Sequence, residues 1–317
     1  MMNQTLKNSE VNLKPGTVIT GKWNKKSYHI HACLGQGAIG SVYLAKQSDQ
    51  KMVALKISDK TASITTEVNV LKSLAKVQGS TLGPSLFDVD DWIDRRGQCY
   101  PFYTMEYVRG NELRSFLRSR GDQWLGLLFI QLLEDLERLH QQGWVFGDLK
   151  IDNLIVASSP PKLRWIDVGG TTQIGRSIKE YTEFYDRGYW QAGSRKADPS
   201  YDLFALAMVA LHYAYPNQFD RGSHPSKTLI EKVKSARLLA PYQDCLRKAL
   251  QGRYQSSEAM KKDLNKILLQ SQPKREPVQN SGKRQRPITK FSAKLAWLES
   301  LIILIIASLF WIIYYFI

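Results

Sequence analysis

Residues 144–155 read WVFGDLKIDNLI, a short polar loop between two apolar runs. The loop contains Asp148, Lys150 and Asn153, and Asp167 follows the later apolar run LRWI. An aspartate in such a loop can orient a hydroxyl nucleophile and take its proton, while a lysine can neutralise a transferring phosphate. Asparagine and aspartate oxygens are suitable ligands for Mg²⁺. The stretch therefore indicates phosphoryl transfer, and the rest of the chain can be tested against that chemistry.

A glycine motif lies upstream, where Gly35, Gly37 and Gly40 separate two runs typical of strands. A dinucleotide-binding fold would use the same glycines, but it needs a helix directly after them. Here the glycines lead into a strand, and the next strand ends in VALK with Lys56. Backbone amides of such a flap can approach phosphates closely, and a strand lysine behind it can reach the α- and β-phosphates.

The joint order of glycine flap, VALK, EYVRG, DLKxDN and Asp-Val-Gly resembles Hanks-type Ser/Thr protein kinases over roughly residues 28–269. The full length is similar to tail-anchored kinases of spore-forming bacilli, which combine this domain with a basic linker and a C-terminal membrane segment. The resemblance implies an α+β, bilobal protein-kinase fold with a small β-rich N-lobe and a larger helical C-lobe. It also implies ATP and Mg²⁺ as cofactors, with Mn²⁺ as a substitute, and Ser/Thr of protein substrates as acceptors.

The same resemblance assigns roles to particular residues. Asp148 and Lys150 would be catalytic, and Asn153 and Asp167 would hold Mg²⁺. The nucleotide would be bound by residues of the flap, the strands, the first helix and the hinge, namely Gly35, Gln36, Gly37, Ala38, Gly40, Val42, Lys56, Glu67, Glu106 and Val108.

Glu67 is the only acid between Asp59 and Asp88, so it is the expected partner of Lys56. The alternative is a solvated acid near the start of the helix predicted over 64–77. Thr104 falls where the family has its gatekeeper, and the backbone of the hinge at 106–110 would bond adenine.

Helical periodicity predicts an apolar helix face over 125–139, which would support the catalytic loop from behind. Asp202 precedes an apolar helix and resembles the family's aspartate that braces the catalytic-loop backbone. A shorter helix is expected over 111–120. Three further helices are expected over 226–239, 241–251 and 256–270.

Residues 170–202 are rich in hydroxyl groups and resemble an activation segment. Thr182 begins a Thr-x-x-Tyr motif, whose threonine contacts the catalytic Asp and Lys in the family. Four hydroxyls are candidates for autophosphorylation: Thr171, Thr172, Ser177 and Thr182.

The chain departs from the family pattern in this region. Phe146 and Gly147 replace the usual His-Arg, so a phosphate on the segment would lose its main basic partner. We therefore hypothesise that activity does not require the usual activation-segment phosphorylation. The family's Ala-Pro-Glu tripeptide is also missing, which leaves Arg253 without its usual partner, and Val168 replaces a phenylalanine.

Composition changes after the predicted kinase domain of residues 1–270. Residues 271–294 contain three prolines and seven Lys/Arg with one acid, so we expect a basic, disordered juxtamembrane linker. Residues 300–317 carry no charge and would span about 27 Å as a helix. We expect residues 295–317 to form a C-terminal transmembrane anchor that holds a cytoplasmic kinase domain at the cell membrane.

The formal net charge of +15 favours an anionic partner, either DNA or anionic lipid, contacted by basic residues of 274–294 and of the kinase domain. A linker that only tethers the anchor remains an equal alternative. Two other functions stay open. A small-molecule phosphotransferase is disfavoured by Lys150 and the Thr-x-x-Tyr motif, and a pseudokinase scaffold would require a missing catalytic group.

Overall fold

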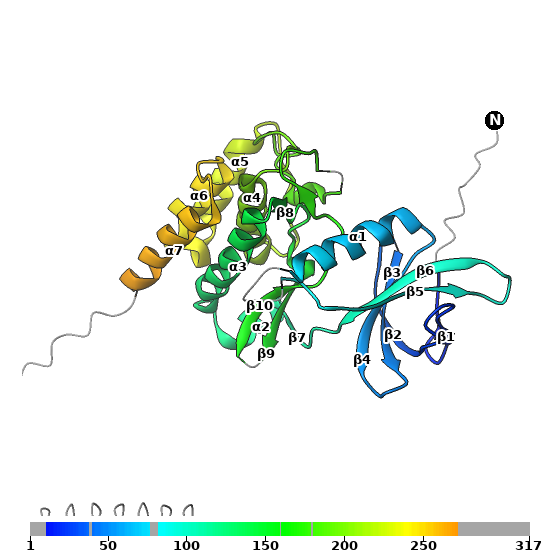
Figure 1. Cartoon of the computed structure of the whole chain (residues 1–317). Helices are drawn as coiled ribbons and strands as arrows, with labels where there is room; N and C mark the ends of the chain where they lie inside the picture. Colours follow the sequence, from blue (N-terminus) through cyan, green and yellow to red (C-terminus); the bar gives the residue numbers. More distant parts are fainter. Residues whose placement is uncertain (1–10, 38–39, 77–81, 159, 179, 272–317) are drawn as a thin grey trace, which may run out of the picture. The chain divides into compact units, whose positions relative to one another are not determined.

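The computed structural model describes two lobes, a strand-rich N-lobe and a mainly helical C-lobe (Figure 1). The α+β, two-lobed architecture expected from the sequence is therefore present. The described residues are 11–37, 40–76, 82–158, 160–178 and 180–271.

The N-lobe sheet is antiparallel and has the strand order β1-β2-β3-β4-β6-β5. The three strands expected between residues 28 and 57 are β2 to β4. The short strand β1 was not predicted, because one buried side chain, Ile19, gives no readable alternation. The strands are β1 (Val18–Thr20), β2 (Ser27–Gly37), β3 (Gly40–Gln47), β4 (Met52–Ile57), β5 (Leu86–Ile93) and β6 (Cys99–Glu106).

The turn after β1 is tied to the edge strand β5. The backbone N–H of Lys22 donates to the carbonyl of Asp91 at 2.7 Å. The buried Asp90 carboxylate accepts the backbone N–H groups of Trp23 at 2.9 Å and Asn24 at 2.8 Å. One face of the curled sheet carries a buried cluster made of Leu13, Ile19, Tyr28, Ile30, Tyr43, Ala45, Val53, Leu55, Ile57 and Phe102.

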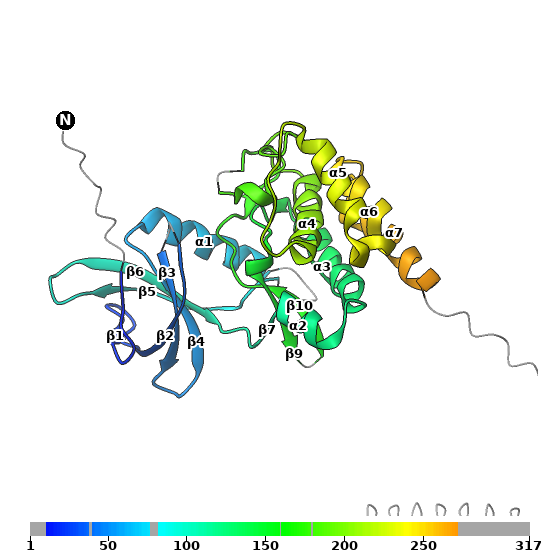
Figure 2. The ribbon, with the colours of Figure 1, turned by 180° about the vertical axis from the view of Figure 1, so that it is seen from behind.

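Helix α1 (Thr61–Leu74) packs on β5 and β6 and lies on the side of the N-lobe that faces the C-lobe (Figures 1 and 2). It begins three residues before the predicted range of 64–77 and ends three residues before its end. The buried residues Ile64, Val68 and Leu71 repeat at helical spacing, as the periodicity predicts. This packing points Glu67 of the same helix inward.

The C-lobe contains six α-helices among the described residues. Short strands and 3₁₀ turns connect them. The helices are α2 (Leu113–Arg120), α3 (Trp124–Gln141), α4 (Pro199–Ala214), α5 (Pro225–Ser235), α6 (Gln243–Leu250) and α7 (Ser257–Ser271). The strands are β7 (Gly110–Glu112), β8 (Trp144–Val145), β9 (Leu154–Ser158), β10 (Pro161–Trp165) and β11 (Thr172–Gln173). The 3₁₀ turns are η1 (Ile151–Asn153), η2 (Glu183–Tyr185) and η3 (Arg237–Tyr242).

The helix predicted over 226–239 is shorter in the structure. Ala236 has extended backbone angles and ends α5, and the chain continues as the 3₁₀ turn η3, which contains Pro241. Proline lacks the N–H that a continuous helix would need at this place.

Helix α4 is the centre of the C-lobe, since every residue from Tyr201 to Tyr213 is buried. It contacts α6, α7, β8 and the turns η1 and η2. A helix that is apolar on all sides must be enclosed by its neighbours. The fully buried charge of Asp202 on this helix therefore needs partners within the protein.

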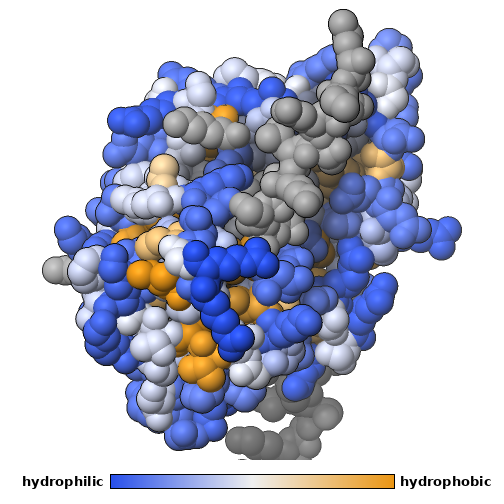
Figure 3. Space-filling model, turned by 90° about the vertical axis from the view of Figure 1, so that its right-hand side faces the viewer, coloured by the Kyte–Doolittle hydropathy of each residue, from blue (hydrophilic) through white to orange (hydrophobic). Residues whose placement is uncertain are grey.

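Seen from the N-lobe end, the surface is mostly hydrophilic with interspersed apolar patches (Figure 3). The large apolar residues that the N-lobe exposes are Val18, Trp23, Leu34, Phe87, Val89 and Ile93. No helix within the described ranges is long and apolar enough to cross a membrane. The linker and anchor expected from the sequence, residues 271–294 and 295–317, lie outside these ranges apart from Ser271.

We expect Asp90→Asn to lower the free energy of unfolding by about 2 kcal/mol at pH 7, because the carboxylate accepts several backbone N–H bonds. Burial disfavours the charge, but these N–H groups outweigh it and lower the pKa of Asp90. A lowered folded-state pKa means that the stabilisation is present near neutral pH and is lost on acidification. Urea unfolding of the full-length protein should therefore show a smaller difference below pH 4. Asp49→Asn, at an exposed turn, is the control, and equal effects at both sites would contradict the argument.

Candidate active site

The buried carboxylate of Asp202 holds the catalytic loop in place. The two carboxylate oxygens accept hydrogen bonds from the backbone N–H groups of Phe146, at 2.8 Å, and Gly147, at 2.9 Å. The ring Nε2 of His140 lies 2.9 Å from Asp202, and the other ring nitrogen lies 3.1 Å from the Ser257 hydroxyl. The expected bracing of the loop by Asp202 is confirmed, and His140 adds a link to α7 that was not predicted.

The backbone conformation at Gly147 disfavours the arginine that the family has at this position of the loop. Its φ of +82° is a conformation that L side chains rarely adopt, and a Cβ atom would lie 2.3 Å from the carbonyl oxygen of Gly170. The loop and the start of the activation segment are therefore in direct backbone contact. A side chain at this position would force them apart.

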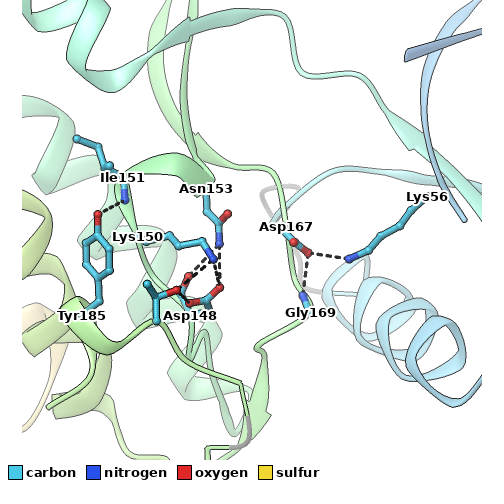
Figure 4. Close-up of polar contacts among 9 residues, drawn as sticks. Lys56, Asp148, Lys150, Ile151, Asn153, Asp167, Gly169 and Tyr185 are labelled. Carbon is cyan, nitrogen blue, oxygen red and sulfur yellow. Dashed lines mark hydrogen bonds and ion pairs between the residues drawn. The ribbon is translucent and has the colours of Figure 1, made fainter. Parts of the chain in front are cut away.

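Asp148 lies at the centre of a polar cluster (Figure 4). Lys150 Nζ is 2.6 Å from one carboxylate oxygen, and the Thr182 hydroxyl donates to the other at 3.1 Å. Lys150 also lies 3.3 Å from Thr182 Oγ1. The amide nitrogen of Asn153 donates to the Asp148 backbone carbonyl at 3.0 Å. The predicted contacts of Thr182 with Asp148 and Lys150 are confirmed.

Lys56 is the buried cation of the site. Its Nζ lies 2.7 Å from Glu67 Oε2 and 3.3 Å from Asp167 Oδ1, which confirms the predicted pairing with Glu67. Tyr103 donates a hydrogen bond of 2.7 Å to the same Glu67 oxygen. Burial opposes the positive charge, but Asp167 and Glu67 outweigh it and raise the pKa of Lys56. Lys56 is therefore a fixed cation where nucleotide phosphates would lie.

Asn153 and Asp167 form the oxygen-rich edge of the cluster. In Figure 4 the amide oxygen of Asn153 points toward the side on which Asp167 lies. Burial disfavours ionisation of Asp167, but Lys56 and the backbone N–H of Gly169 outweigh it and lower the pKa of Asp167. An amide oxygen and a carboxylate suit Mg²⁺ when nucleotide phosphates complete its shell. No cluster of three or more His, Cys, Asp or Glu that could hold a metal occurs among the described residues.

The glycine flap is the hairpin that joins β2 to β3. Gln36 pairs with Ser41 and Gly37 with Gly40, while Gly35 faces Val42 across the strands. Gly40 has a φ of +139°, and a Cβ atom there would lie 2.6 Å from the carbonyl oxygen of Ile57. Ala38, a predicted nucleotide contact at the tip, lies outside the described residues.

The hinge contains Glu106 and Val108. The Glu106 side chain turns to Arg164 of β10, whose guanidinium donates to it at 2.9 Å, and this hydrogen bond lowers the pKa of Glu106. The carboxylate is thus occupied by a contact within the protein, and only the backbone of Glu106 remains to meet adenine. Val108 is buried beside it. Arg164 could not be identified from sequence, because its partner lies 58 residues away.

The gatekeeper prediction for Thr104 is wrong by one residue. Tyr103 and Met105 belong to the buried cluster shared with α1, whereas Phe102 belongs to the cluster on the other face. Because side chains alternate along a strand, Thr104 faces away from Lys56. Met105 therefore takes the place beside the site.

The four candidate phosphorylation sites differ in their surroundings. Thr171 is buried, and Thr172 is half-buried with its hydroxyl donating to the Gly170 carbonyl at 3.0 Å. Thr182 is engaged by Asp148 and Lys150. Ser177 is exposed, so it is the most accessible of the four.

A two-lobed fold with a buried lysine paired to a helix glutamate, a loop aspartate, and an asparagine and an aspartate beside them is the arrangement typical of protein kinases. The protein kinase domain family matches residues 28–283, and the chain belongs to that family. It is a bacterial Hanks-type protein serine/threonine kinase, on the evidence of this match and of its curated relatives.

One such relative is the serine/threonine-protein kinase YabT of Bacillus subtilis (strain 168), which is 50% identical over 282 residues, or 89% of this chain and 83% of YabT. The serine/threonine-protein kinase ppk11 of Schizosaccharomyces pombe is 27% identical over 221 residues, covering 65% of this chain and 67% of ppk11. The solved structure of vaccinia related kinase 3 has a TM-score of 0.60 at 16% identity, covering 84% of this chain and 95% of that chain. That structural likeness supports the fold alone.

We expect Gly147→Ala to lower kcat by about 10-fold or more, because the new methyl group would push the catalytic loop away from Gly170. Gly143→Ala is the matched control, since Gly143 has a similar φ of +81° but no atom within 4 Å of the place that a methyl group would take. It should cost about 1 kcal/mol of stability without changing kcat. Steady-state kinetics and thermal melting of both variants check this, and equal kcat values would contradict it.

Proposed function

We propose that this kinase transfers the γ-phosphoryl group of ATP, in the presence of Mg²⁺, to Ser or Thr of protein substrates and of its own chain. The observation that carries the proposal is the contact of Thr182 with both Asp148 and Lys150. It brings a segment suited to docking a polypeptide directly to the catalytic loop. That placement favours a protein acceptor over a small molecule. None of the expected catalytic groups is missing from the sequence, which disfavours a scaffold without activity.

Asp148 would orient the acceptor hydroxyl and take its proton while the hydroxyl oxygen bonds to the γ-phosphorus and the bond to the ADP oxygen breaks. Lys150 would neutralise charge on the transferring group. Lys56, held by Glu67, would contact the α- and β-phosphates. These groups position the reactants and balance charge, which is most of what phosphoryl transfer requires.

Asn153 and Asp167 would hold Mg²⁺ through oxygen atoms, and Mn²⁺ could substitute for it. The bound ion would neutralise phosphate charge. The glycine flap, with Gly35, Gln36, Gly37, Ala38, Gly40 and Val42, would cover the nucleotide, while the backbone at Glu106 and Val108 would meet adenine.

We also propose that residues 1–270 form the kinase domain, residues 271–294 a basic linker and residues 295–317 a single-pass anchor in the cell membrane, with the kinase domain in the cytoplasm. The uncharged run at 300–317 and the seven Lys/Arg beside it support this arrangement. Binding of the linker to DNA or to anionic lipid would raise the local concentration of kinase and promote phosphorylation between chains.

We expect Asp148→Asn to reduce transfer of radiolabel from γ-labelled ATP by about 10² to 10⁴-fold, because the general base is removed. ATP affinity should be unchanged. Asp152→Asn, an exposed neighbour in η1, is the control and should retain activity. The assay uses the full chain in detergent with Mg²⁺ and myelin basic protein. Full label transfer by Asp148→Asn would contradict the catalytic assignment.

The same assay with duplex DNA or anionic vesicles tests regulation. Stimulation should disappear when the seven basic linker residues are changed to Gln. Activity and binding that are identical with and without these residues would leave the linker as a tether only.

Changing Thr171, Thr172 and Ser177 together to Ala should leave phosphorylation of myelin basic protein within about threefold of the wild type, because no arginine precedes Asp148 to receive a phosphate. Thr182 is kept, since its hydroxyl belongs to the catalytic cluster. Mass spectrometry would confirm that the segment carries no phosphate. A folded triple variant without activity would contradict the hypothesis that phosphorylation is dispensable.

A further inference from the structure

The activation segment closes on itself through backbone hydrogen bonds. The N–H of Gly175 donates to the Ala197 carbonyl at 2.9 Å, and the Ala197 N–H donates to the Arg176 carbonyl at 2.7 Å. The Ile178 N–H donates to the Arg195 carbonyl at 2.8 Å. Residues 175–178 are thus paired with residues 195–197, and these backbone hydrogen bonds close the intervening residues into a loop.

Asp186 lies inside this loop with no exposed surface. Arg195 approaches one carboxylate oxygen with two nitrogens, at 2.8 and 2.6 Å. The backbone N–H groups of Gly188 and Tyr189 donate to the carboxylate at 3.1 and 2.8 Å, and the Tyr201 hydroxyl of α4 donates at 2.9 Å. Both oxygens of this buried charge are therefore satisfied, and the loop is connected to the central helix.

The neighbouring Arg187 is buried and forms a second ion pair, with the half-buried Asp198. Its guanidinium lies 2.6 Å from Asp198 and also donates to the carbonyls of Ser194 at 2.6 Å and Lys196 at 2.9 Å. Two ion pairs thus hold the same part of the segment. In the pair of Asp186 with Arg195 the acid comes first along the chain, and in the pair of Arg187 with Asp198 the base comes first. Arg253, whose usual glutamate is absent, is in no ion pair among the described residues.

The turn η2 connects Asp186 to the residues that contact the catalytic loop. Thr182 precedes η2 and Asp186 follows it, and the Tyr185 N–H donates to the Thr182 carbonyl at 2.9 Å. The Tyr185 hydroxyl accepts the N–H of Ile151 in the catalytic loop at 3.3 Å. Fixing Asp186 therefore fixes one end of a single turn whose other end places the Thr182 hydroxyl on Asp148.

We propose that Asp186, through its ion pair with Arg195, is a positioning residue that presets the substrate-docking segment without a phosphate. The Asp186 carboxylate is buried but its partner Arg195 is partly exposed, so the pair adds little to stability and its benefit lies in specifying one conformation. The acceptor polypeptide then meets a segment that is already aligned with the catalytic loop. The inference rests on the proposed roles of Asp148 and Thr182.

The test compares Arg195→Gln and Asp186→Asn in full-length protein in detergent, with myelin basic protein and γ-labelled ATP. The Arg195 side chain is 40% exposed, so its replacement is compatible with a folded protein. We expect kcat/KM for the protein substrate to fall by about 10- to 100-fold, because a small displacement of positioning groups has effects of this size. The affinity for a fluorescent ATP analogue should stay within about twofold, since the pair lies outside the nucleotide contacts.

Three comparisons separate positioning from general damage. Arg195→Lys should restore only part of the activity, because lysine keeps the charge but loses the two-nitrogen contact. The double variant should be no worse than Asp186→Asn alone, since both changes remove one pair. Arg237→Gln, at an exposed arginine of η3, should behave as wild type.

Full activity of folded Arg195→Gln and Asp186→Asn would overturn the inference, as would equal losses in ATP affinity and protein phosphorylation. Asp148→Asn in the same assay distinguishes failure of the proposed catalytic roles from failure of the positioning role. If Asp148→Asn is active, the proposed catalytic roles fail. If it is inactive while the Asp186 and Arg195 variants are fully active, only the positioning role fails.

Discussion

The buried carboxylate of Asp202 is the constraint on which the site depends. Taking an ionised carboxylate out of water costs several kcal/mol unless strong donors replace the water. Here the donors are the backbone N–H groups of Phe146 and Gly147, with the ring of His140 beside them. The same bonds that satisfy the charge define the path of the catalytic loop. The loop therefore takes its position from a helix that is enclosed on all sides.

Lys56 is a second buried charge whose contacts fix the site, here at the junction of the lobes. It lies on an N-lobe strand and contacts Glu67 of α1 as well as Asp167, which follows the C-lobe strand β10. The hinge pair of Glu106 and Arg164 joins the lobes a second time. A charged contact in a site shielded from water acts more strongly than one at the surface. The junction of the two lobes is therefore organised around the charges of Lys56, Glu67 and Asp167.

Much of this could be predicted from sequence, because the decisive residues lie in short, dense motifs. The loop of Asp148, the VALK strand and the apolar stripe of α3 each give a local signal of spacing or periodicity. The misses have a different origin. Whether Thr104 or Met105 lies on the same face of the sheet as Lys56 depends on which face of β6 packs on α1, and a shift of one residue reverses the answer. The pairing of Glu106 with Arg164, and of His140 with Ser257, joins distant segments whose contact no local pattern encodes.

Gly147, which replaces the family's arginine, and the Asp186–Arg195 pair both bear on how the activation segment is held. In a segment held by a phosphate, a catalytic-loop arginine supplies the positive partner, and order depends on a reversible modification. Gly147 carries no side chain, and its backbone instead touches the segment at Gly170. The Asp186–Arg195 pair supplies both charges from within the segment itself. On the proposed positioning role of this pair, a phosphate at that place would add little order, and control would act where it changes how often the enzyme meets its substrates. The basic residues of 271–294, in the role proposed for them, would act at that step, because they would concentrate the domain on an anionic surface without altering the site.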